Sequence, residues 1–158
     1  MLLNVYKYFD EPESLPYYHG IHDKFALLNK WHSWGDGVSV EELKPLLGII
    51  KRNPEYAFLY ARGVMRSRWI EAEPVIMTHP TYAEWYAEFV LAKDSEWISI
   101  KGHENGRWPE AENYIMKDPY QAYMYAKNVI KDRWIEAEPN IKKSTDDWWK
   151  YNQLFKIS

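Results

Sequence analysis

Four segments of the chain share one pattern of apolar positions. They begin at Pro54, Pro80, Pro119 and Thr145. Their matching positions follow the spacing i, i+3, i+4 and i+7, which places them on one face of an α-helix. The matching positions are Ala57, Ala83, Ala122 and Trp148; Tyr60, Tyr86, Tyr125 and Tyr151; Ala61, Ala87, Ala126 and Asn152; and Val64, Val90, Val129 and Phe155. We therefore expect four similar helices whose Ala and Tyr columns are buried.

The spacing of these segments indicates an internal repeat of 26 residues. Their starts lie 26, 39 and 26 residues apart, so the second unit is 13 residues longer than the others. The extra residues fall between Val90 and Arg107, and we assign an insertion to about residues 94–106. Good N-cap residues precede three helices and a weak one precedes the fourth, namely Asn53, Asp118, Ser144 and His79.

A seven-residue phrase, RWIEAEP, separates the long segments. It stands at residues 68–74, returns unchanged at 133–139, and returns with two changes at 107–113. Its Trp and Ala, with the Ile that follows, predict a short second helix, which Pro74 and Pro139 reduce to a tight turn and a kink. Because the two glutamates recur in every copy, we interpret them as structural, with the first one bound to the Arg of the phrase or to a neighbouring unit.

The N-terminal third follows the pattern less closely. Residues 1–53 are interpreted as an irregular arm with a first helix at about 23–34, and then a divergent first unit. In that unit Ser39 and Glu42 form a capping box, and Pro45 kinks the helix. The predicted fold is all-α: a single domain, residues 1–158, forming a short α-solenoid of about four 26-residue two-helix repeats with an irregular N-terminal arm. The repeats occupy residues 54–158.

Composition narrows the classes of function. A hydrophobic content of 46% is ample for a core, whereas a net charge of −3 and a pI near 6.0 lack the basic excess of a nucleic-acid binder. The chain has no cysteine, which excludes disulfides and thiol chemistry. No apolar run is long enough to span a membrane, so we expect a cytoplasmic protein without membrane or nucleic-acid partners.

The amino-acid sequence of the repeat resembles that of a helical repeat found in proteins of large tailed bacteriophages, most of them uncharacterised. The shared features are RW(I/P)EAEP-x-I, a following (D/N)P and A-x-x-YA, over residues 47–155. The insertion, Asn113 in place of Pro, and the eroded fourth copy depart from it. The resemblance implies a viral accessory protein in the cytoplasm of a bacterial host cell that binds and redirects a host or defence protein. It implies no catalytic residue.

Two alternative functions come from other residues. The N-terminal His19, His22 and His32, with Asp23 and Asp36, are of the types that bind zinc in a metal-dependent hydrolytic enzyme. Their spacing does not ensure that they converge, so we assign no metal ligand, no catalytic residue and no cofactor. Aromatic residues off the main helix face would suit stacking on a small ligand such as a nucleotide; these are Tyr56, Phe58, Tyr82, Trp85 and Tyr123.

The insertion is the strongest indication of function, because loops that depart from a repeat often carry recognition. It brings charged and hydrogen-bonding groups and a large ring to a place that the other units lack. We therefore predict a non-enzymatic protein-binding module, a phage-encoded inhibitor or adaptor. The candidate partner-binding residues are Asp94, Glu96, Trp97, His103, Glu104 and Asn105, together with Trp85.

Overall fold

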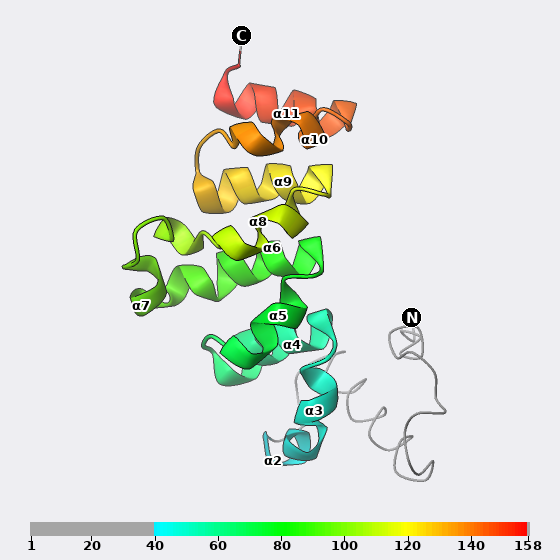
Figure 1. Ribbon diagram of the computed structural model, residues 1–158, viewed down its shortest axis with the longest axis vertical. Coiled ribbons are helices and arrows are strands. Elements are labelled where there is room, and N and C mark those ends of the chain that lie inside the picture. Colours follow the sequence, from blue (N-terminus) through cyan, green and yellow to red (C-terminus); the bar gives the residue numbers. More distant parts are fainter. Residues whose placement is uncertain (1–39, 158) are drawn as a thin grey trace, which may run out of the picture.

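The computed structural model describes residues 40–157 (Figure 1). Every regular element in this range is helical, which confirms the predicted all-α class. The helix expected at residues 23–34, the N-terminal histidines and Ser39 lie outside the described residues. The elements are α2 (Val40–Leu43), η4 (Lys44–Leu46), α3 (Leu47–Ile50), α4 (Pro54–Tyr60), η5 (Ala61–Met65), η6 (Ile70–Ala72), α5 (Glu73–Ile76), α6 (Pro80–Phe89), η7 (Leu91–Lys93), α7 (Ser95–Ile98), η8 (Glu104–Gly106), α8 (Pro109–Ile115), α9 (Pro119–Tyr125), η9 (Ala126–Ile130), η10 (Ile135–Ala137), α10 (Glu138–Ile141) and α11 (Thr145–Phe155).

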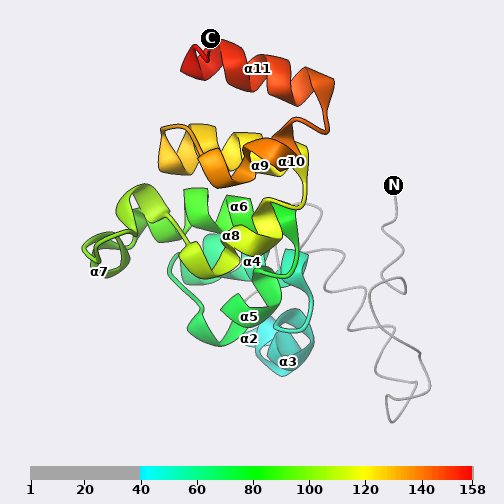
Figure 2. The same cartoon turned by 45° about the horizontal axis from the view of Figure 1, so that its top comes forward.

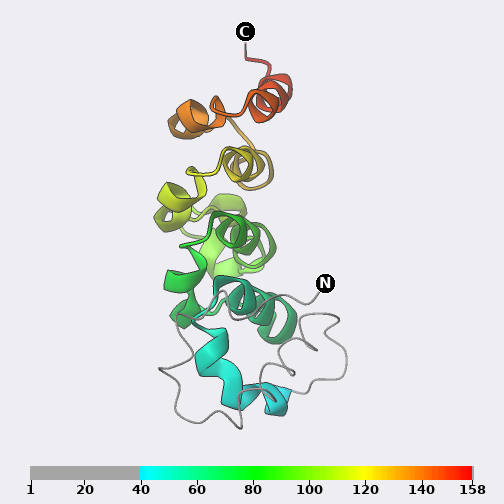
Figure 3. The same cartoon turned by 90° about the vertical axis from the view of Figure 1, so that its right-hand side faces the viewer.

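The helices lie in two layers along the long axis of the molecule (Figure 3). One layer holds α4, α6, α9 and α11, each in contact with the next. The other holds the short helices α5, α8 and α10, which contact α4, α6 and α9 respectively. Each short helix comes from one copy of the phrase, and each long helix from one of the four segments with matching apolar positions.

The predicted burial of the Tyr column is confirmed. Tyr60, Tyr86, Tyr125 and Tyr151 are all buried. The alanines of the first three segments at the two Ala columns have no exposed surface, so a small side chain lies beside a large ring at each level of the stack. This alternation lets the two layers approach closely while the rings fill the space between them.

The starts of the long helices are capped as their N-cap residues predict. Asn53, Asp118 and Ser144 each accept a hydrogen bond from the backbone N–H three residues on, whereas His79 forms no such side-chain cap. These four outcomes are those predicted. The earlier helix is interrupted by the 3₁₀ turn η4 at Pro45, as expected, because proline lacks the N–H that a continuous helix needs.

Proline also explains why the short helices differ. In the first and third copies of the phrase a 3₁₀ turn, η6 or η10, precedes a four-residue helix with Pro74 or Pro139 in its first turn. In the second copy Asn113 replaces that proline, and α8 is continuous. The predicted tight turn followed by a kink is therefore confirmed in the copies that contain Pro74 and Pro139, and it is absent from the copy that contains Asn113.

A left-handed residue reverses the chain before every copy of the phrase. Arg66, Asn105 and Lys131 have φ of 54°, 58° and 59°, and each lies two residues before the Arg of its phrase. Arg66 and Lys131 follow the π-helical turns η5 and η9. Asn105 lies in the insertion, which returns the chain to the same backbone geometry before the phrase begins.

Candidate functional site

One hydrogen-bonded network recurs in all three copies of the phrase and holds its elements in place. The Arg guanidinium binds the second Glu, and this carboxylate also accepts a hydrogen bond from the Tyr hydroxyl of the following long helix. The hydroxyl oxygen in turn accepts a hydrogen bond from the backbone N–H of the Trp. The three sets are Arg68, Trp69, Glu73 and Tyr86; Arg107, Trp108, Glu112 and Tyr125; and Arg133, Trp134, Glu138 and Tyr151.

The protonation states suit this network. Burial raises the pKa of the Tyr86 and Tyr125 hydroxyls well above the ordinary tyrosine value, and raises the pKa of Tyr151 to about 12. Hydrogen bonding to its glutamate raises the pKa of each arginine in the network. The hydroxyls therefore stay protonated at neutral pH and donate to the carboxylates.

The interpretation that the first Glu of each pair binds this arginine is wrong. The second Glu does so, with closest N–O distances of 2.9, 2.6 and 2.7 Å in the three copies. Residues two apart on a helix point in different directions, so only one of the pair can face the long helix. The first glutamates, Glu71, Glu110 and Glu136, are exposed. The alternative, a pair with a neighbouring unit, is confirmed for Glu71, which lies 3.2 Å from Lys51.

The insertion is anchored by Trp97, whose buried ring lies between two other side chains. His103 stacks on it at 4.1 Å between ring centroids, and the Arg68 guanidinium lies 4.1 Å from the ring centroid. The indole N–H donates to the Arg107 carbonyl oxygen at 3.0 Å. The Asp94 carboxylate accepts a hydrogen bond from the backbone N–H of Trp97 and so caps α7. Trp97 thus joins the insertion to the first and second copies of the phrase.

Gly106 fixes the end of the insertion against α6. Its φ is +87°, and a Cβ there would lie 2.4 Å from the Ala87 carbonyl oxygen and 2.5 Å from the Ala92 nitrogen. Backbone atoms cannot move aside as a flexible side chain can, so only glycine fits. Lys131, the residue after η9, donates a 3.4 Å hydrogen bond to the Asn105 side chain. The insertion is thus held at both its centre and its end.

The outer side of the insertion carries apolar and acidic groups. Figures 1 and 2 show α7 projecting from one side of the stack. Ile98 and Ile100 are 37% and 49% exposed, and Glu96 and Glu104 are exposed beside them in the sequence. A hydrogen bond from the Gly102 N–H lowers the pKa of Glu104, which keeps this carboxylate ionised.

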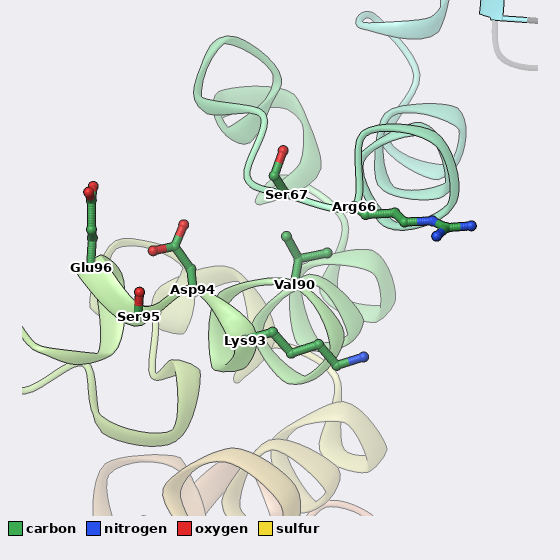
Figure 4. Close-up of a pocket in the computed structure, with 7 residues that line it drawn as sticks. All are labelled: Arg66, Ser67, Val90, Lys93, Asp94, Ser95 and Glu96. Atoms are coloured by element: carbon green, nitrogen blue, oxygen red, sulfur yellow. The ribbon is translucent and has the colours of Figure 1, made fainter.

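A cavity of about 290 Å³ lies where the insertion begins (Figure 4). Arg66 and Lys93 extend to one side of it, and Asp94 and Glu96 lie on the other side of Val90. Ser67 and Ser95 complete its lining. A neighbouring cavity of about 210 Å³ shares three of these residues and adds Arg62 and Phe89. Arg62 is held there with its guanidinium carbon 4.3 Å from the centre of the Phe89 ring.

The structure distributes the predicted partner-binding residues over different places. Asp94 and Glu96 line the larger cavity, whereas Trp97 and His103 face the interior as anchors. Glu104 and Asn105 form the turn that ends the insertion. Trp85 belongs to α6 rather than to the insertion; it packs against Phe58 and Tyr82 and keeps part of its surface exposed.

Three cations and two isoleucines at this site are not among the residues predicted from the sequence. None of the three cations, Arg62, Arg66 and Lys93, belongs to a motif. Only Arg66 has a fixed place in the repeat, because it is the left-handed residue two positions before the phrase. Most of the proposed aromatic strip is absent from the surface, because Tyr56, Phe58 and Tyr123 are buried.

Within residues 40–157 no group of three or more His, Asp or Glu side chains is placed to hold a metal ion. Over the same range no helix is both long and apolar enough to cross a membrane. Comparisons of the chain with protein-family models, with curated proteins and with solved structures find no match.

Proposed function

We propose that the chain is a short α-solenoid of about four 26-residue two-helix repeats that acts as a non-enzymatic protein-binding module. Its binding site is the outer side of the insertion with the adjoining cavity. The recurrence of the Arg, Trp, Glu and Tyr network at constant spacing supports the repeat. The anchored insertion supports the function, because it adds 13 residues to the second unit and interrupts the 26-residue period.

The observation that carries this proposal is the combination of a fixed interior and an apolar outer face. Trp97 and Gly106 hold the insertion, so little conformational freedom is left to lose when a partner binds. Ile98 and Ile100 expose apolar surface, and a bound partner would remove that surface from water. The neighbouring charges favour some partners over others and fix the orientation of binding.

The biological setting follows from the resemblance to bacteriophage repeats. On that basis the module is a phage accessory protein that inhibits or redirects a host or defence protein in the bacterial cytoplasm. Sequestration of a nucleotide is less favoured by the cavity, because Asp94 and Glu96 would repel a triphosphate that Arg66 and Lys93 attract.

Capture from bacterial lysate tests the proposal. The tagged full-length protein is compared with the variant I98S/I100S, and with Y120S/L154S as a control of similarly exposed apolar residues. We expect the first protein and the control to retain one protein in stoichiometric amount, identified by mass spectrometry. The I98S/I100S variant should retain about tenfold less, as for loss of a central interface contact.

Two results would overturn this proposal. One is that the wild-type protein retains no protein; the other is that I98S/I100S retains as much as the control. An unchanged melting temperature in all variants is required, and is expected because the altered side chains are at the surface.

A further inference from the structure

The phrase is repeated unchanged even where it faces solvent. When residues 54–79 are aligned with 119–144, seven positions are exposed in both units. Four of them differ, namely Arg62/Lys127, Arg66/Lys131, Ser67/Asp132 and Thr78/Lys143. Three are identical, namely Ile70/Ile135, Glu71/Glu136 and Pro74/Pro139, and all three lie in the phrase.

Internal structure accounts for the other letters of the phrase. Its Arg and second Glu form a part-buried ion pair, its Trp backbone N–H donates to the Tyr hydroxyl, and its Ala is fully buried. The proline begins the short helix, where its missing N–H costs nothing. Internal structure therefore accounts for the Arg, Trp, Ala and second Glu, and tolerates the proline.

The isoleucine has no such explanation. Ile70 and Ile135 are 67% and 66% exposed, and neither is among the buried or partly buried residues of the apolar clusters in residues 40–157. A polar residue there would leave every described contact of the core unchanged. The first glutamate gains some stability at a helix start, where aspartate, serine or threonine would serve equally well, and Glu71 also lies 3.2 Å from Lys51.

The same chemistry is present in the second copy. Pro109 replaces the isoleucine and is followed by Glu110, and both are exposed. Each unit therefore presents an apolar side chain followed by an acid. The pairs occupy equivalent positions of the three copies, in η6, at the start of α8 and in η10. The helices α5, α8 and α10, which these positions precede or begin, follow one another along the long axis (Figures 1 and 3). We name Ile70, Glu71, Pro109, Glu110, Ile135 and Glu136 the phrase row.

We propose that the phrase row is a second interaction surface, which binds an elongated segment of the partner protein bearing alternating apolar and basic side chains. The inference rests on the proposed protein-binding function. The acids of the row attract Lys and Arg and repel nucleic acid. The row also adjoins the insertion, because Arg68, two residues before Ile70, covers Trp97. One partner can therefore contact both surfaces.

Two variants of the full-length protein test the apolar and acidic parts separately. I70S/I135S removes the apolar groups and is matched by Y120S/L154S. E71K/E136K reverses the acids and is matched by D132K/D146K, which changes the net charge equally at other exposed positions. In the lysate experiment we expect each phrase-row variant to retain the partner about tenfold less than its control.

The results separate this inference from the proposed function. If the wild-type protein retains no protein, both fail. If it retains a partner that I70S/I135S and E71K/E136K retain equally well, only the phrase row is rejected. If I70S/I135S loses the partner and I98S/I100S does not, the phrase row is the binding site and the insertion is not. Melting temperatures equal to that of the wild-type protein show that each loss is not due to unfolding.

Discussion

Glu84 shows how one residue changes the chemistry of the core. It lies on α6 and is only 1% exposed, at a position where the aligned residues in α4 and α9 are Phe58 and Tyr123. Burial, and then the nearby charge of Glu88, raise the pKa of Glu84 to about 8. Asn128 donates a 3.0 Å hydrogen bond to Glu88, so Glu84 and Glu88 lie close to the contact between α6 and η9. Glu84 is therefore mostly protonated at neutral pH.

This pKa predicts a particular pH dependence of stability. In the unfolded chain Glu84 loses its proton near pH 4.5, whereas in the folded protein it keeps the proton until about pH 8. The folded state binds more protons in this interval, so the free energy of unfolding should fall as pH rises from about 4.5 to about 8. Urea unfolding of the wild-type protein and E84Q from pH 5 to 9 measures this.

The glutamine variant keeps the shape of the side chain and cannot ionise. We expect wild-type protein and E84Q to be similar near pH 5, and E84Q to be the more stable above pH 8. Parallel pH profiles for the two proteins would show that the buried carboxyl group does not titrate with the raised pKa.

At the scale of the element, the phrase and the following long helix form the unit of stability. The short helices have only four to seven residues and would not persist alone in water. The Tyr hydroxyl of the long helix compensates for this, because it binds both the Trp backbone and the Glu that holds the Arg. The network thus satisfies buried polar groups at a helix start that has no side-chain cap.

The substitution Y125F tests this role. It leaves the buried N–H of Trp108, which donates to the hydroxyl at 2.6 Å, without its partner. We expect a loss of about 1–3 kcal/mol in the free energy of unfolding, the usual cost of an unsatisfied buried donor. Y120F, at an exposed tyrosine on the same helix, should have almost no effect. Equal stability of the two variants in chemical denaturation would contradict the role of the hydroxyl.

At the scale of the whole molecule, stabilising contacts are made mainly between neighbouring helices of the stack. In the long-helix layer, α6 contacts α4 and α9, and α9 contacts α11. The networks centred on Tyr86 and Tyr151 share no residue and are separated by the network of Tyr125. Within residues 40–157 the contacts between long helices therefore join nearest neighbours along the long axis.

This arrangement predicts additive effects for distant networks. The double variant Y86F/Y151F should lose the sum of the two single losses in free energy of unfolding, to within about 0.5 kcal/mol. The adjacent pair Y86F/Y125F is the comparison, because their long helices α6 and α9 are in contact. A larger deviation from additivity in the distant pair than in the adjacent pair would contradict nearest-neighbour stabilisation.

Much of the fold was predictable because the repeat supplies several copies of each signal. The Ala and Tyr columns identified the buried face, and Asn53, Asp118 and Ser144 marked helix starts, since both depend on local spacing and local hydrogen bonds. Pro74 and Pro139 predicted the kink for the same reason. The place of the insertion followed from the distances in sequence between the starts of the four segments.

The sequence by itself therefore determined the helical class, the helix boundaries near the caps and the position of the departure from the period. Only the tertiary structure decided which Glu of each pair binds Arg, that Trp97 is an anchor, and that Ile70 and Ile135 remain exposed. The physical reason is distance along the chain. Helix periodicity relates residues within a few turns, whereas Arg68 meets Trp97, and Trp69 meets Tyr86, only when separate helices pack together.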